Sequence, residues 1–160
     1  MKLLFLAPQP FFQDRGTPIA VRLALEVLAR RSADTPLPAG RDSIDLLTYH
    51  EGRPVDIAGI KTYRIPAFRL LNGIGPGLSL KKLACDLIFF LSMLKLLWLN
   101  RREQYDLIHA VEESVFMAWF AKLCFKIPYI YDMDSSLSLQ VSETWSLLKP
   151  LYPIDRKIVV

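Results

Sequence analysis

The chain has 160 residues, of which 52% are apolar and 22% charged, with a formal net charge of +4. This length suits one domain with a real hydrophobic core, and the apolar fraction excludes a disordered protein. Two cysteines exclude a disulfide scaffold, and two histidines with two cysteines do not suit a structural zinc site. We therefore expect no metal and a reducing, cytoplasmic environment.

The basic excess lies in the middle third of the chain. Residues 51–100 carry seven basic and three acidic side chains, whereas the flanking thirds are nearly balanced. The sequence contains no Lys/Arg run longer than two, so nucleic acid is not an expected partner.

Apolar runs alternate with helical patterns along the chain. Short apolar runs predict strands over residues 2–8, 44–49, 60–65, 106–110 and 128–132. Helical spacing predicts helices over residues 18–31, with Thr17 as N-cap, from Ser79 to about 102, over 112–126 and near 139–148. This order predicts an α/β fold: a doubly wound, mostly parallel, Rossmann-like sheet with helices on both faces.

Ligands of such sheets lie beyond the carboxyl ends of the strands. We expect four segments to converge there: the loops after Pro8 and Tyr49, residues 109–113 and residues 132–136. The chain has no phosphate-binding loop motif, no G-x-G-x-x-G after the first strand and no G-x-S-x-G. Residues 73–77, GIGPG, are either a flexible loop before a capped helix or a place where backbone N–H groups and neighbouring lysines hold an anion.

Residues 83–99 are the most apolar stretch, interrupted by Asp86 and Lys95. Three interpretations are open: a helix buried against the sheet, an interfacial helix lying in a membrane surface, or a membrane span. Basic anchors flank the stretch at 81–82 and 101–102. The N-terminal apolar run ends at Pro8 and is too short for a signal peptide. A cytoplasmic protein is expected, peripheral at the inner face of the membrane if this helix is interfacial.

Four segments together resemble the N-terminal domain of the family 4 retaining glycosyltransferases. They are FLAPQPFFQDRGTPIAVRLALEVLARR (5–31), IDLLTY (44–49), DLIHAVEE (106–113) and PYIYDMDSS (128–136). The resemblance implies the GT-B architecture, in which two Rossmann-like domains face each other across a cleft. It also implies transfer of a sugar from a nucleotide sugar to an acceptor hydroxyl.

The resemblance further divides the chain. Residues 1–148 would form the acceptor-side domain, and residues 149–160 would begin the connection to a C-terminal donor-binding domain that this sequence lacks. Activity is therefore not expected from the chain alone, and a separate donor-binding chain is an expected partner. An alternative function is a non-catalytic module that binds an acceptor or a partner at a membrane surface.

Roles near the donor diphosphate follow from the resemblance. Gly16 would let the backbone approach the diphosphate, and Thr17 and Arg15 would lie beside it. Gly16 could instead serve only the turn, and Arg15 could be solvated.

The remaining candidate residues follow the fourth and fifth strands. By the same resemblance, His109, Asp132 and Asp134 would be the candidate catalytic residues, and Glu112 and Glu113 the candidate acceptor ligands. His109 could instead be a hydrogen-bonded core histidine, the two glutamates could suit the helix dipole, and the aspartates could cap a turn.

Overall fold

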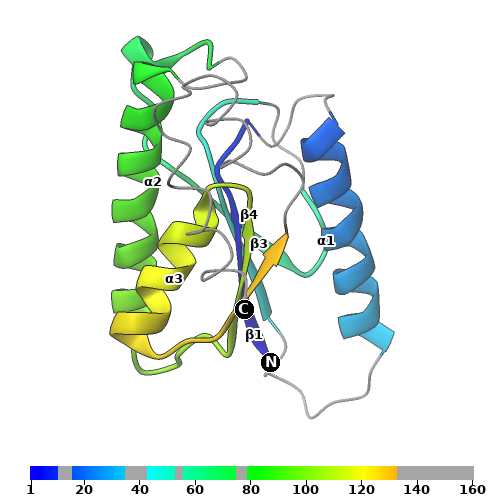
Figure 1. Ribbon diagram of the computed structural model, residues 1–160. Helices are drawn as coiled ribbons and strands as arrows, with labels where there is room; N and C mark the ends of the chain where they lie inside the picture. The colour runs from blue at the N-terminus through cyan, green and yellow to red at the C-terminus, as the bar shows by residue number, and fades with distance from the viewer. Residues whose placement is uncertain (11–15, 35–42, 53–55, 75–78, 133–160) are drawn as a thin grey trace, which may run out of the picture.

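The computed structural model describes residues 1–10, 16–34, 43–52, 56–74 and 79–132. Figure 1 shows a sheet between two helical layers, with α1 on one side and α2 and α3 on the other. The strands are β1 (Lys2–Ala7), β2 (Ser43–Thr48), β3 (Ile60–Arg64), β4 (Leu107–Val111) and β5 (Tyr129–Asp132). The helices are α1 (Gly16–Asp34), the short 3-10 helix η1 (Arg69–Leu71), α2 (Leu80–Leu99) and α3 (Ser114–Phe125).

The five strands form one parallel sheet in the order β3-β2-β1-β4-β5. The first strand of the chain is therefore the central one, and Phe5 lies opposite Leu46 on β2 and His109 on β4. The predicted Rossmann-like α/β fold, with helices on both faces, is confirmed. All five strands end at the same edge, which is where a ligand of such a sheet is expected.

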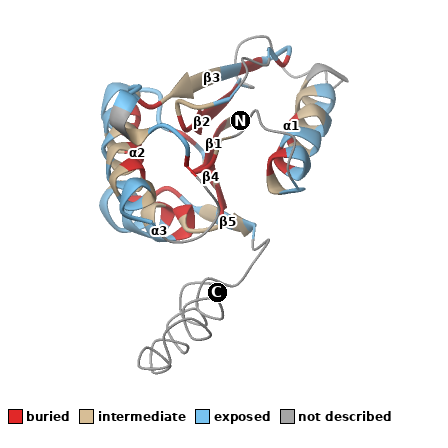
Figure 2. Cartoon of the chain, turned by 90° about the horizontal axis from the view of Figure 1, so that it is seen from above, coloured by how far each residue is buried: buried red, intermediate tan, exposed pale blue. Residues whose placement is uncertain are grey.

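The core has one layer on each face of the sheet, because successive strand residues point to opposite sides. Phe5 on β1 packs with Val21 and Leu25 of α1 on one face. Leu4 and Leu6 lie in the cluster of the other face, with residues of α2 and α3. Figure 2, seen along the sheet, shows buried residues concentrated on the strands and on the helix sides that face them.

Most predicted boundaries shift by one to three residues, and the helix predicted to run to about residue 102 ends at Leu99. Three of the differences involve candidate site residues. Thr17 is wrong as an N-cap, because α1 already begins at Gly16. β4 continues to Val111, so His109 lies within the strand and does not end it. α3 begins at Ser114 instead of residue 112, because Glu112 adopts a left-handed backbone (φ 50°) that a helix cannot contain. By contrast, Ser79 is confirmed as the cap of α2, since its hydroxyl accepts a bond from the Lys82 amide (3.1 Å).

The long apolar helix lies along the sheet. Its inner side buries Cys85, Phe89 and Met93. Among the described residues no helix is long and apolar enough to cross a membrane, which excludes the spanning interpretation of residues 83–99. The helix predicted near 139–148 and the connection at 149–160 lie outside the described residues.

Candidate functional site

The carboxyl edge of the sheet brings together segments that are far apart in the sequence. The Gln9 carbonyl, just after β1, accepts bonds from the Thr48 hydroxyl (2.9 Å) and the Tyr49 amide (3.4 Å) at the end of β2. On the other side, the Glu112 amide donates to the Asp132 carbonyl at the end of β5 (3.2 Å). The predicted convergence is therefore present for the described parts of these segments.

His109 and Asp132 form a pair on the α1 side of the sheet. The imidazole Nε2 lies 3.5 Å from a carboxylate oxygen of Asp132, and the ring stacks on Phe5 with the centroids 4.2 Å apart. Burial lowers the pKa of His109, and the contact with Asp132 opposes that shift only in part. The imidazole is therefore mostly neutral at pH 7 and can accept a proton, while the half-exposed carboxylate can orient it.

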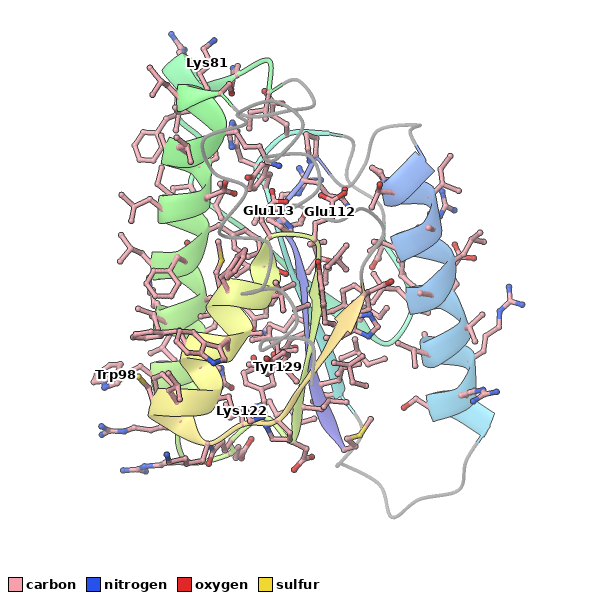
Figure 3. All side chains as sticks on the ribbon, in the orientation of Figure 1. Lys81, Trp98, Glu112, Glu113, Lys122 and Tyr129 are labelled. Atoms are coloured by element: carbon pink, nitrogen blue, oxygen red, sulfur yellow. The ribbon has the colours of Figure 1, made fainter. Side chains whose placement is uncertain are left out.

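The first turn of α1 meets the turn between β4 and α3. The Thr17 hydroxyl lies 3.5 Å from the Glu112 carboxylate, and Figure 3 shows Glu112 and Glu113 at this turn. The left-handed backbone of Glu112 costs about 1–2 kcal/mol for a residue with a Cβ. Such strain is concentrated at functional sites, so the turn is a natural place for a ligand contact.

Glu112 and Glu113 do not act together. Whereas Glu112 faces Thr17, Glu113 pairs with Lys82 in the first turn of α2. One predicted acceptor ligand is thus engaged in an ion pair on the α2 side of the sheet, and the other lies beside α1.

A partly buried hydrogen bond adjoins that ion pair. The Tyr49 hydroxyl donates to the carboxylate of Asp86, one turn along α2 from Lys82. Burial raises the pKa of Asp86 to about 6, and the negative charge of Glu113 adds to the rise. The bond from Tyr49 and the charge of Lys82 act in the opposite direction. Asp86 is therefore a carboxylate that changes charge close to neutral pH.

Gly73, in the glycine-rich loop, has an internal partner. Its amide and the Ile74 amide both donate to the carboxylate of Glu51, the latter bond measuring 3.2 Å. The anion that these N–H groups bind is therefore the chain's own Glu51 carboxylate. The neighbouring Lys81 ammonium donates to the Asn72 carbonyl (3.2 Å). The interpretation of this loop as a phosphate cradle therefore gains no support from its described residues.

Gly16 has no internal steric reason to be a glycine. Its backbone is not left-handed, and a Cβ at this position would meet none of the described residues within 4 Å. The turn before Gly16, residues 11–15, lies outside the described residues, so the role of this glycine stays a prediction.

Three polar residues of this edge were not expected from the sequence. Tyr49 was expected only as the end of a strand and Asp86 as an interruption of an apolar helix. Lys82 was expected as a flanking charge or as one of the lysines that hold an anion at the glycine-rich loop, not as the partner of Glu113. A charge inside an apolar helix that covers a sheet requires a partner, which is the one signal that could have indicated Asp86. Two further candidates, Arg15 and Asp134, lie outside the described residues.

Within the described residues, no group of three or more His, Cys, Asp or Glu side chains could hold a metal ion. Comparison with known proteins gives no assignment: no protein-family model matches the chain, and no curated protein matches it significantly.

Proposed function

We propose that this chain is the acceptor-side half of a glycosyltransferase that moves a sugar from a nucleotide sugar to an acceptor hydroxyl. The proposal rests on the resemblance of four segments to family 4 retaining enzymes and on the placement of these segments around one edge of the sheet. A Rossmann-like fold by itself does not determine function.

The single observation that most directly supports the proposal is the position of Gly16, a residue without a side chain, at the start of α1. A helix N-terminus presents free N–H groups and a positive dipole end to an anion. The absence of a side chain there leaves the backbone open to a diphosphate, and nothing in the described surroundings requires that absence. Glu112, which contacts Thr17, would place a hydrogen-bonding carboxylate beside the acceptor hydroxyl.

The His109–Asp132 pair supplies a second element of the proposed site. It lies on the same side of the sheet as α1 and combines a mostly neutral imidazole with a half-exposed carboxylate. Such a pair could accept a hydrogen bond or a proton from an acceptor hydroxyl.

The test is an NMR titration of the 160-residue chain with UDP-glucose, GDP-mannose and inorganic pyrophosphate. Saturable shifts of the Gly16, Thr17 and Glu112 amides are expected. Gly16→Ala should weaken the binding about tenfold, which corresponds to about 1.4 kcal/mol, without loss of stability. Thr17→Ser, which keeps the hydroxyl, is the matched control and should bind as the wild type does. Equal affinity of Gly16→Ala, or no shifts with any of the three probes, would refute the proposed diphosphate contact.

A second measurement tests whether sugar transfer needs a separate donor-binding domain. We expect the purified chain to show no sugar transfer and no donor hydrolysis. Either activity in the chain alone would contradict the inference that a separate donor-binding domain is needed.

The alternative, a non-catalytic module at a membrane surface, is favoured by a different observation: the exposed apolar residues of α2 and α3. Binding to membranes by a chain that binds none of the three nucleotide or phosphate probes would favour this alternative.

A further inference from the structure

The surface of α2 that faces away from the sheet is apolar. Its exposed residues include Leu80, Leu83, Leu87, Leu91 and Trp98. Their spacing of three, four or seven residues places them on one stripe, opposite the buried Cys85, Phe89 and Met93. In Figure 3, Lys81 and Trp98 mark the two ends of this helix.

The neighbouring helix α3 continues the same surface. Phe116, Trp119, Phe120 and Leu123 are exposed on it, and its buried residues, such as Ala118 and Ala121, lie on the opposite side. An edge-to-face contact between Phe90 and Phe120, with the ring centroids 5.3 Å apart, joins the two helices. We call these five exposed residues of α2 and four of α3 the outer face.

The outer face is unusual for a surface exposed to water. A helix covering a sheet normally presents charged and polar residues to the solvent. Among the twelve residues of α3, however, Lys122 is the only charged one. Large contiguous apolar surfaces of this kind mark interaction sites.

The charges around the outer face are cationic. Lys81, Lys95 and Lys122 are exposed on the two helices, and Arg101, Arg102 and Lys126 follow the helix ends. The Arg101 guanidinium lies over the Trp98 ring, 5.1 Å from its centroid.

Two of the three acidic groups near the outer face are engaged on the side of the sheet. Asp86 is partly buried against Tyr49, and Glu113 is paired with Lys82. Beyond the end of α2, Glu103 lies 3.9 Å from the Lys2 ammonium on β1. Among the described residues, the cations around the outer face therefore outnumber the acids exposed beside it.

The combination of an apolar surface with surrounding cations distinguishes between two kinds of partner, a second copy of the chain and an anionic bilayer. A second copy docked on the same face would bring like charges together, which opposes association. A bilayer with anionic headgroups complements the cations, and tryptophan, phenylalanine and leucine enter the boundary between headgroups and acyl chains.

We propose that the outer face of α2 and α3 docks on the surface of an anionic phospholipid bilayer, with both helices lying in the plane of the interface. The inference rests on these two helices and does not depend on the proposed sugar transfer. It makes the interfacial interpretation of residues 83–99 more specific, because α3 contributes four apolar anchors in addition to the five of α2.

The test is flotation of the chain with two kinds of vesicle: phosphatidylcholine alone, or equal parts of phosphatidylcholine and phosphatidylglycerol. We expect binding to the anionic vesicles at low salt and much weaker binding to the neutral ones. High salt should weaken the binding, and the double variant Lys81→Gln/Lys95→Gln should weaken it about fivefold per charge removed.

The apolar contribution has a matched control on the opposite side of the molecule. Leu87 and Leu91 on α2 are 60% and 55% exposed, and Leu23 and Val27 on α1 are 57% and 53% exposed. Leu87→Gln/Leu91→Gln should lower the binding about tenfold or more, whereas Leu23→Gln/Val27→Gln should leave it unchanged. Circular dichroism verifies that both variants fold.

Three outcomes would overturn the proposal. One is no flotation of the folded wild type with anionic vesicles at low salt. The second is an equal loss of binding in the α1 and α2 variants, since the binding would then not be specific to the outer face. The third is a dimer that the α2 variant abolishes, without any vesicle binding, which would show that a second copy covers this face.

Discussion

Replacing Asp86 by asparagine should remove a pH-dependent loss of stability that the wild-type protein carries. The pKa of Asp86 rises from 3.8 to about 6 on folding, mainly because the carboxylate is buried on α2. The folded protein therefore holds this proton more tightly than the unfolded chain does. The free energy of unfolding that this tighter proton binding adds is fully present below pH 3.8. It is lost as the pH rises through about 6.

The magnitude follows from the size of the shift. One pKa unit corresponds to about 1.4 kcal/mol, so a shift from 3.8 to about 6 gives about 3 kcal/mol as an upper value. Because Asp86 is partly exposed, solvent screening reduces this to about 1–3 kcal/mol. The asparagine side chain of the variant carries no charge at any pH, and its amide oxygen can still accept the bond from Tyr49.

The assay is urea unfolding of wild type and Asp86→Asn at a series of pH values, with circular dichroism as the signal that monitors unfolding. The free energy of unfolding of the variant minus that of the wild type should increase by about 1–3 kcal/mol between pH 3.8 and about 6 and then stay constant. His109 contributes a trend of opposite sign, since its lowered pKa makes stability rise with pH, but this contribution is common to both proteins and cancels in the difference.

A difference that is constant across this pH range, or that decreases, would refute the reasoning. Tyr49→Phe provides a second check. The bond from Tyr49 lowers the pKa of Asp86, so its removal should move the upper end of the pH window to higher pH. An unchanged window in Tyr49→Phe would mean that the hydroxyl does not interact with the carboxylate.

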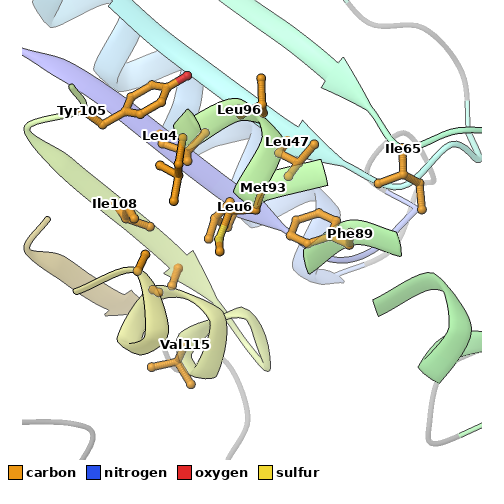
Figure 4. Packing of buried hydrophobic residues seen from close by; sticks show 14 of the residues in the cluster. Leu4, Leu6, Leu47, Ile65, Phe89, Met93, Leu96, Tyr105, Ile108 and Val115 are labelled. Carbon is orange, nitrogen blue, oxygen red and sulfur yellow. The ribbon is translucent and has the colours of Figure 1, made fainter. Parts of the chain in front are cut away.

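Three further stability predictions use the same denaturation assay. Phe89→Ala should lower the free energy of unfolding by about 3–5 kcal/mol, because the ring is fully buried between α2 and the sheet (Figure 4); a loss below about 1 kcal/mol would contradict this packing. Ser79→Ala should cost about 1 kcal/mol by removing the cap of α2, and Ser79→Asp should restore it. Glu112→Gly should raise stability by about 0.5–1 kcal/mol by relieving the left-handed backbone, whereas Glu112→Ala should not.

The fold was predictable because its signals are local. A run such as LLFLA in β1 is apolar throughout, as a strand buried on both faces must be, and the alternation of such runs with helices requires a parallel sheet. The boundaries were less predictable. Glu112 follows β4 with a left-handed backbone, so α3 begins later than predicted. A glycine or asparagine at this position would have indicated such a conformation, because these residues adopt it readily, whereas a glutamate does not indicate it.

The candidate site was predictable only in part, for a related reason. Parallel topology brings His109 and Asp132 to neighbouring strands, so their proximity followed from the pattern. The separate engagement of Glu113 with Lys82, however, depends on which way each side chain turns after β4. Sequence spacing contains no information on this, because the partner lies on a helix that is distant along the chain.

The central position of β1 also has a consequence for how the protein folds during synthesis. The strand emerges from the ribosome before either of its neighbours, and β4, which covers its second edge, begins only at Leu107. Until then one edge of an apolar strand stays open to pairing with other chains, and contacts of long sequence separation form slowly. Holding by a chaperone, or slower translation before residue 107, should therefore increase the yield of native protein more than for a fold whose first strand is an edge strand.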